Sequence, residues 1–281
     1  MGQLEPALRR PGAGAVAESG THTYDRIGLG YATSRRPDPR IAAMLHGALA
    51  GCRSVVNVGA GAGSYEPVDR RVVAVEPSAT MVAQRARGAA PVVRATAAAL
   101  PFAADAFDAA LAVLTVHHWG DRRRGLRELR RVARRRVVLL TYDPRAAGER
   151  FWLVARYLPE VQELDAPRFP SGDELTEALG PVAVRPVPIP ADCVDGFLGA
   201  FWRRPEAYLE PALRDRMSVF AQLPAAAVSS GLARLGADLA SGEWDRRFGG
   251  LRARESLDLG YRLVVADRSG ADSLAQQIVL R

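Results

Sequence analysis

Short apolar runs alternate with segments of helical spacing over the first half of this chain. Run 107–116 is apolar throughout, as expected for a strand covered on both faces of a sheet. Strands that alternate with helices predict an α/β fold, with a mostly parallel sheet and right-handed crossovers. The runs that predict strands span residues 53–58, 71–77, 91–95, 107–116 and 135–143.

Three helices are predicted beside these strands. The helix over 38–50 has Asp38 as its N-cap and Pro39 at its first position. A short helix covers 78–86, and an arginine-rich helix covers 122–136. The apolar face of this arginine-rich helix consists of Leu126, Leu129, Val132 and Ala133.

The pattern changes after residue 143. Residues 148–180 are predicted to be helices and loops, and residues 195–245 to be mostly helical. Residues 182–190 predict a sixth strand, whose prolines suit a sheet edge or a strand end. Residues 259–268 return to strand character. We therefore expect a helical cap inserted between the last two strands of one sheet.

The composition is that of a globular protein with a sizeable core, since 48% of the 281 residues are hydrophobic and 25% are charged. No apolar stretch is long enough to span a membrane, and the first residues lack the apolar segment of a secretory signal. Cys52 and Cys193 share no redox or metal-ligand spacing, so no metal site is expected. These features predict a cytoplasmic protein with reduced thiols.

The net charge of +7 raises the possibility of a nucleic-acid partner. All 38 basic residues are arginine, however, and a GC-rich genome would produce the same bias. We interpret the arginines of 122–136 as a solvated helix face. Neither a nucleic acid nor a membrane is the expected partner.

A loop with glycine at every second position follows the first strand. Gly59, Gly61 and Gly63 form G-x-G-x-G, whereas a dinucleotide fold has G-x-G-x-x-G opening a helix. Only seven residues separate Gly63 from Arg71, and one of them is proline. Because a helix hardly fits there, the loop favours a nucleoside ligand without a pyrophosphate.

An acid ends the second strand. Glu76 follows Gly59 by 17 residues, where a carboxylate can accept hydrogen bonds from both hydroxyls of a ribose. A strand-end acid bonded to a neighbouring loop is the alternative. The carboxyl ends of parallel strands meet at one edge, so the glycine loop, Glu76 and the residues after Val113 are expected to converge.

Four stretches together resemble one family. They are NVGAGAGSYEP, VAVEPSATM, ALPFAADAFDAALAVLTVHHWGD and LRELRRVARRRVVLLTYD. In this order they resemble the class I S-adenosylmethionine-dependent methyltransferases, in particular the small-molecule group with ubiquinone-type and trans-aconitate-type enzymes. The resemblance covers about residues 20–145. It implies a Rossmann-like seven-stranded sheet with an antiparallel last strand, which suits 259–268.

The resemblance also implies how the cofactor, S-adenosylmethionine, is bound. The glycine loop approaches its methionine part, Glu76 its ribose, and Pro77 and Met81 its adenine. Thr96 stands where many relatives carry an acid, and Asn57 replaces the usual Asp of the first strand. The expected cofactor residues are Tyr31, Arg36, Gly59, Ala60, Gly61, Gly63, Glu76, Pro77, Met81, Thr96, Ala97 and Leu114.

The segment YDRIGLGYATSRRPDPR (24–40) resembles the N-terminal lid of this family. Tyr31 and Arg35 or Arg36 could close over the cofactor, with an arginine near its carboxylate. The alternative is a surface arginine in a mobile segment. The expected organisation is a disordered lead-in (1–21), a cofactor-binding core with the lid (22–145), a substrate cap with the sixth strand (146–256), and the last core strand and tail (257–281).

His117 and His118 are the candidate catalytic residues. They follow the fourth strand at the cofactor edge, and an imidazole can accept a proton near neutral pH. Alternatively, they cap the next helix or pack beside Trp119. Arg203 and Arg204 either meet an acidic acceptor or are solvated. Residues that could line an apolar acceptor pocket, although most could be core, are Phe151, Trp152, Tyr157, Phe197, Phe201, Trp202 and Tyr208.

The favoured function is methyl transfer from S-adenosylmethionine to a small molecule, with O-methylation slightly ahead of N- or C-methylation. The basic charge motivates RNA or protein methylation as an alternative, which the lack of an N-P-P-Y-type signature disfavours. Thr96 and the short segment after the glycine loop motivate a second alternative, a non-catalytic cofactor-binding module. The glycine spacing makes a nicotinamide-dependent oxidoreductase the least favoured of the four.

Overall fold

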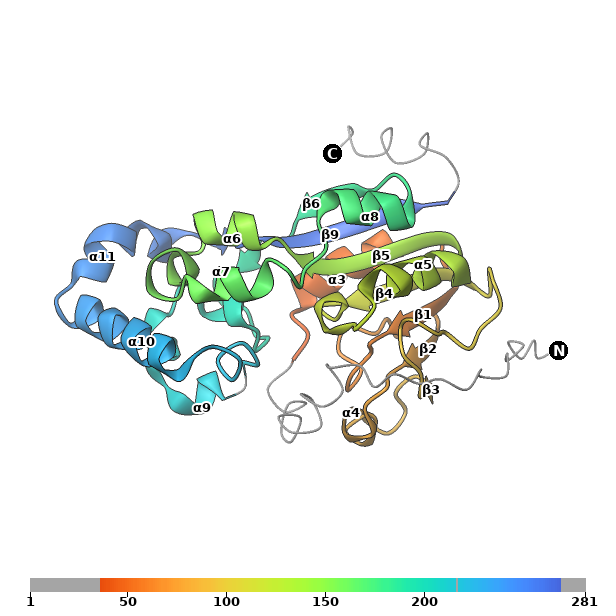
Figure 1. The fold of residues 1–281 in the computed structure, drawn as a ribbon, viewed down its shortest axis with the longest axis horizontal. Coiled ribbons are helices and arrows are strands. Elements are labelled where there is room, and N and C mark those ends of the chain that lie inside the picture. Colours follow the sequence, from red (N-terminus) through yellow and green to blue (C-terminus); the bar gives the residue numbers. More distant parts are fainter. Residues whose placement is uncertain (1–35, 216, 269–281) are drawn as a thin grey trace.

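The computed structural model describes residues 36–215 and 217–268. A seven-stranded sheet runs through it in the order β3-β2-β1-β4-β5-β9-β6 (Figure 1). Strands β1 to β5 are parallel, and β9 is antiparallel to both β5 and β6. This confirms the predicted α/β fold. The strands are β1 (Ser54–Val58), β2 (Arg71–Val75), β3 (Val92–Val93), β4 (Phe107–Val113), β5 (Ala133–Tyr142), β6 (Ala183–Pro186) and β9 (Tyr261–Asp267).

Helices cover both faces of the sheet. Asp38 caps α3 (Pro39–Ala48) by accepting a hydrogen bond from the Arg40 N–H, as its position before a proline predicts. Ser78 caps α4 (Ala79–Ala83) in the same way through the Met81 N–H. Helix α3 lies on one face, while α5 (Arg122–Val132) and α8 (Gly172–Leu179) cover the other.

The arginine-rich helix differs from its prediction in two respects. It ends at Val132 instead of 136, because Ala133 already pairs with Phe107 in the sheet. Its outer face is also not simply solvated. Arg122 forms an ion pair with Glu174 and Arg123 one with Glu177, both on α8, with N–O distances of 2.8 and 2.9 Å. Three residues of the predicted apolar face, Leu126, Leu129 and Val132, are fully buried on α5, whereas the fourth, Ala133, is buried as the first residue of β5.

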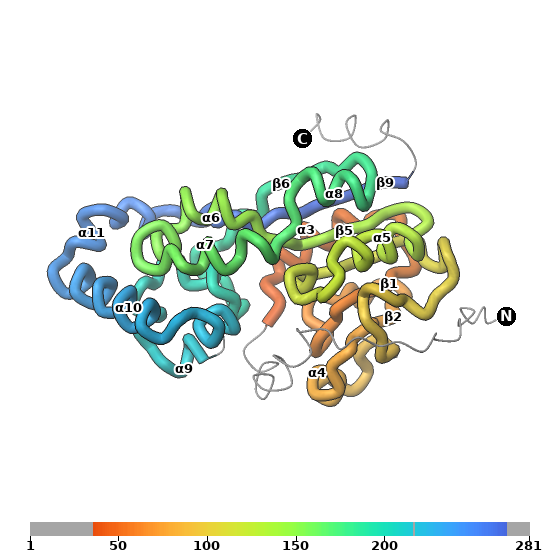
Figure 2. The backbone as a smooth tube through the Cα atoms, in the orientation of Figure 1, coloured from red at the N-terminus to blue at the C-terminus, as the bar shows by residue number. Residues whose placement is uncertain are grey.

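The segment between β5 and β9 divides into two parts. Helix α8 and strand β6 return to the sheet, where α8 packs on α5 and β6 pairs with β9. The remaining helices form a cap beside the sheet (Figure 2). The α-helices of the cap are α6 (Pro144–Arg150), α7 (Glu160–Asp165), α9 (Pro211–Arg214), α10 (Ala225–Ala240) and α11 (Glu243–Phe248). The cap also contains the π-helix η2 (Leu153–Tyr157) and the 3₁₀ turns η3 (Leu198–Phe201), η4 (Pro205–Leu209) and η5 (Gly249–Ala253). Its two short strands, β7 (Ile189–Pro190) and β8 (Ser256–Leu257), pair with each other.

Aromatic side chains form the core of the cap. The Trp152 ring packs edge-on against Trp244 and Tyr208, with centroids 5.3 and 5.7 Å apart. Its indole N–H donates to the Trp202 carbonyl at 2.9 Å. Most of the aromatic residues proposed for a pocket are therefore core; those 2% exposed or less are Phe151, Trp152, Tyr157, Trp202 and Tyr208. None of the described helices combines the length and the hydropathy needed to cross a membrane.

Candidate active site

The glycine loop joins β1 to β2 at the carboxyl edge of the sheet. Gly59, Gly61 and Gly63 have φ angles of 69°, 53° and 97°, a region that favours glycine. The N–H groups of Gly59 and Ala60 donate to the Val75 carbonyl at 2.9 and 3.0 Å, which fixes the loop against the end of β2. The described backbone between β1 and β2 contains turns and no helix. A pyrophosphate would find no helix N-terminus there.

Glu76 holds the loop from the end of β2. Its side chain is buried, and its two oxygens accept hydrogen bonds from the Gly61 N–H at 2.8 Å and the Ser78 N–H at 3.0 Å. This is the contact with a neighbouring loop that the sequence left open as an alternative. A carboxylate has about four lone-pair positions, so these bonds are compatible with ribose binding, which stays a prediction.

A buried charge network explains why the first strand carries Asn57. The Asn57 amide donates to Glu66 at 3.1 Å, and Arg85 forms an ion pair with the same carboxylate at 2.7 Å. Arg85 also donates to the Gly61 carbonyl at 3.2 Å. The side chains of Glu66 and Arg85 are only 10% and 5% exposed. An aspartate at position 57 would place a second negative charge beside Glu66, so the amide suits this network.

Tyr65 connects the glycine loop to the cap. Its backbone has a φ of 64°, unusual for a residue with a side chain, and its ring is 2% exposed. The hydroxyl donates to Asp195 at 2.8 Å and accepts from the Asp38 N–H at 3.3 Å. Asp195 immediately precedes cap residues that line the pocket described below.

The turn after β4 lies beside the glycine loop. Leu114 adopts a φ of 49° and donates its N–H to the Leu140 carbonyl at 2.8 Å. A Cβ at Gly59 would overlap with the Thr115 side chain, so the two loops pack too closely for any residue but glycine. This approach brings Leu114 to the predicted cofactor edge.

The other predicted cofactor residues differ in how deeply they are buried. Met81 is buried behind Gly61, and a Cβ on that glycine would lie 3.2 Å from the Met81 Cε. Ala97 is 3% exposed and packs in the core beneath α5, whereas Thr96 is half-buried. The Pro77 carbonyl accepts a hydrogen bond from Arg94. Arg36 is exposed, whereas Tyr31 and Arg35 lie outside the described residues.

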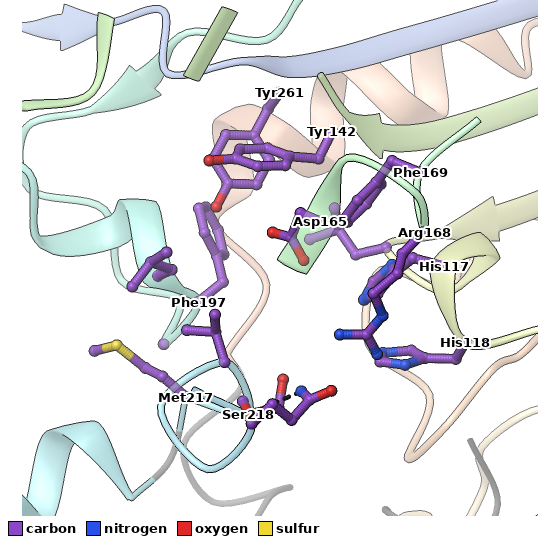
Figure 3. A pocket seen from close by; sticks show the side chains of 15 residues that line it. His117, His118, Tyr142, Asp165, Arg168, Phe169, Phe197, Met217, Ser218 and Tyr261 are labelled. Carbon is purple, nitrogen blue, oxygen red and sulfur yellow. Dashed lines mark hydrogen bonds between the residues drawn. The ribbon is translucent and has the colours of Figure 1, made fainter. Parts of the chain in front are cut away.

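A pocket opens between this edge and the cap (Figure 3). On the sheet side its residues come from the turn after β4, from η1 (Val116–His118), and from β5 and β9. On the cap side they come from α7 and the segments around 197 and 218. The residues that line it are Leu114, His117, His118, Tyr142, Asp165, Arg168, Phe169, Gly196, Phe197, Leu198, Met217, Ser218, Val219, Gln222 and Tyr261.

Rings in contact form one wall of this pocket. His117 stacks on Phe169 with centroids 4.3 Å apart, and Tyr142 lies 5.3 Å from Phe169. Tyr142 in turn lies 5.0 Å from Tyr261, which lies 4.8 Å from Phe197. Of the cap aromatics proposed from the sequence, Phe197 lines the pocket.

The two predicted catalytic histidines reach this pocket side by side. Their ring centroids are 3.8 Å apart. Burial and the positive charge of Arg168 lower the pKa of His118 to about 3, so its imidazole is neutral at physiological pH. Arg203 and Arg204 do not line the pocket; they donate to backbone carbonyls of the cap.

Two charged residues of the pocket were missed by sequence reasoning. Asp165 ends α7 and is 9% exposed, and burial raises its pKa to about 6 despite the lowering effect of Arg168. Arg168 follows three residues later. In the sequence they look like ordinary polar positions at a helix end, and no spacing marks them as a pair. No group of three His, Cys, Asp or Glu side chains suited to a metal ion occurs in the described part of the chain.

Comparisons with known proteins agree with this geometry. The methyltransferase domain family matches residues 56–141. A protein of Anabaena variabilis, assigned as a methyltransferase from an antibiotic biosynthesis pathway, is 33% identical, and the alignment covers 83% of this chain and 98% of that one with a TM-score of 0.75. This chain belongs to the class I S-adenosylmethionine-dependent methyltransferases.

Two more distant solved structures share the fold alone. The [4+2]-cyclase SpnF is 15% identical with a TM-score of 0.51, over 92% of this methyltransferase and 98% of that chain. Phosphoethanolamine N-methyltransferase 2 of Haemonchus contortus is 10% identical with the same TM-score, over 89% and 60% of the two chains. No curated protein gave a significant match.

The residues of the methyltransferase fit its cofactor, S-adenosylmethionine. The glycine loop leaves its backbone open to close approach, and the buried Glu76 carboxylate stands at the end of the adjacent strand. Leu114 belongs both to this edge and to the pocket. A cofactor held by the loop would therefore have one end beside the pocket, while the cap closes the opposite side.

Proposed function

We propose that this methyltransferase methylates a small molecule bound in the pocket between sheet and cap, with a hydroxyl oxygen as the first acceptor atom to test. The observation that carries the proposal is that Leu114 joins the cofactor edge to a pocket walled by aromatic rings. Bound S-adenosylmethionine supplies a methyl group already activated by the sulfonium. The protein then mainly has to align the acceptor and exclude water.

The two histidines are proposed to receive the proton of the acceptor hydroxyl. His118 offers a neutral lone pair, but its low pKa makes it a weak base. His117, held by stacking on Phe169, is therefore the first residue to test. We expect His117→Ala to slow methylation far more than it weakens cofactor binding. Equal turnover in the variant and the wild type would contradict this role.

The acceptor is proposed to come from specialised metabolism. The support is the relative from Anabaena variabilis, which is assigned to an antibiotic biosynthesis pathway. The ubiquinone-type and trans-aconitate-type group stays a prediction from the sequence. Ion pairs between α5 and α8 engage Arg122 and Arg123, which weighs against RNA as the acceptor.

Calorimetric titration with S-adenosylhomocysteine, and separately with NADH, tests the first step. We expect saturable binding of S-adenosylhomocysteine alone. Screening of hydroxylated aromatic acceptors with labelled S-adenosylmethionine tests the second step. Binding of NADH alone would contradict the cofactor assignment, and methylation of RNA alone would contradict the small-molecule acceptor.

A further inference from the structure

The Asp165 carboxylate is the least satisfied charged group of the pocket. It is 9% exposed, yet no described residue donates a hydrogen bond to it or forms an ion pair with it. Its backbone carbonyl, in contrast, accepts from the N–H groups of Arg168 and Phe169 at 2.9 and 3.1 Å. Hydrogen bonds therefore fix the backbone at Asp165, while its carboxylate has no partner among the described residues. A buried carboxylate without a partner is costly, and a ligand can supply that partner.

Arg168 does not neutralise this carboxylate. The two residues lie one helical turn apart in sequence, but no ion pair within 4.0 Å joins them. Figure 3 shows the Asp165 carboxylate directed into the pocket and the Arg168 guanidinium beside His117 and His118. Arg168 is half-buried, whereas Asp165 is among the buried residues. The deeper charge of the pocket is therefore negative.

The walls around Asp165 suit a cation. Phe169, Tyr142, Tyr261 and Phe197 form a continuous series of ring contacts. Ring faces attract ammonium groups, and the attraction grows when water is excluded. Hydrogen bonds between an ammonium and a carboxylate are about twice as strong as those between neutral groups.

We propose that the pocket takes an acceptor that carries a protonated amine, which the Asp165 carboxylate binds among these aromatic rings. The inference rests on the proposed function, since it concerns the same acceptor pocket. In this proposal the amine only binds the acceptor to the pocket and does not receive the methyl group. The hydroxyl that receives the methyl group would lie toward His117 and Leu114, at the cofactor edge. An aromatic or cyclic amino alcohol has both groups.

Three probes with one ring and different head groups test this inference. Phenethylamine is cationic, 2-phenylethanol neutral and phenylacetate anionic at neutral pH. Each is titrated calorimetrically into the full chain saturated with S-adenosylhomocysteine. We expect phenethylamine to bind at least about tenfold more tightly than 2-phenylethanol, and phenylacetate to bind most weakly.

Matched variants distinguish the effect of the charge at Asp165 from the effect of the net charge of the protein. Asp165→Asn should abolish the advantage of phenethylamine. Glu163→Gln makes the same change in charge at an exposed position of α7 outside the pocket, and should preserve that advantage. Arg168→Gln should leave phenethylamine binding unchanged or tighter, because it removes a competing positive charge. Unchanged S-adenosylhomocysteine affinity shows that each variant is folded.

Several outcomes would overturn the inference. They are equal affinity for phenethylamine and 2-phenylethanol, equal losses in Asp165→Asn and Glu163→Gln, or preferred binding of phenylacetate that Arg168→Gln removes. Absence of phenethylamine binding at millimolar concentration, with S-adenosylhomocysteine bound, also contradicts the inference but leaves the proposed function intact. Failure to bind S-adenosylhomocysteine would instead count against the proposed function.

Discussion

Glu76 and Asp165 are buried to nearly the same extent but are used in opposite ways. Glu76, 7% exposed, accepts backbone hydrogen bonds from Gly61 and Ser78 and braces the glycine loop. Asp165, 9% exposed, receives no side-chain hydrogen bond from the described residues, and its pKa is raised to about 6. The cofactor edge is thus braced by the protein itself, whereas the pocket beside the cap keeps a negative charge that no described residue pairs with.

This comparison predicts that the largest losses of stability arise at the braced edge. Arg85→Ala would leave the Glu66 carboxylate buried without its cation. We expect a loss of about 3 to 5 kcal/mol in the free energy of unfolding, together with weaker S-adenosylhomocysteine binding, because Arg85 also holds the Gly61 carbonyl. Urea unfolding and calorimetry measure both effects. Arg87→Ala, at an exposed position two residues later, is the control and should change little.

The unsatisfied carboxylate should appear in the pH dependence of stability. The pKa of Asp165 rises from 3.8 to about 6 on folding, so ionisation disfavours the folded state. The contribution of protonated Asp165 to the free energy of unfolding is fully present below pH 4 and is lost as the pH rises through 6. Relative to Asp165→Asn, the wild type should lose about 3 kcal/mol between these limits. Urea unfolding across this range tests it, with Glu163→Gln as control; parallel curves for wild type and Asp165→Asn would contradict it.

A smaller loss in the free energy of unfolding is expected when the family's usual acid is restored in the first strand. Asn57→Asp replaces a hydrogen bond to Glu66 with a repulsion between two buried carboxylates. We expect a loss of about 2 kcal/mol at pH 7.5 that shrinks as the pH falls, because protonation of either acid relieves it. Adding Glu66→Gln should recover part of the loss. A stabilised Asn57→Asp variant would refute this account of Asn57.

The same contrast explains what the sequence could predict. Most strands, the Asp38 cap and the glycine loop depend on local patterns, so their positions followed from spacing. The strand predicted over 182–190 is the exception, because it divides into β6 in the main sheet and β7, which pairs with β8. The helix over 122–136 was predicted too long because ARRR suits a helix as well as a strand, and only the pairing of Ala133 with Phe107 decides between them. Asp165 became a pocket residue through the packing of α7 on α6 and η2 within the cap, which no local pattern encodes.

Two tyrosines provide the smallest and most direct test of the contrast. The Tyr142 hydroxyl is buried in the pocket with no hydrogen-bond partner among the described residues, while the Tyr65 hydroxyl donates to the buried Asp195 at 2.8 Å. Tyr142→Phe should change the free energy of unfolding by no more than about 0.5 kcal/mol, because it deletes only an unsatisfied group. Tyr65→Phe removes the same atom but should cost about 1 to 3 kcal/mol. Equal losses in urea unfolding would mean that the pocket is braced like the glycine loop, and the contrast would fail.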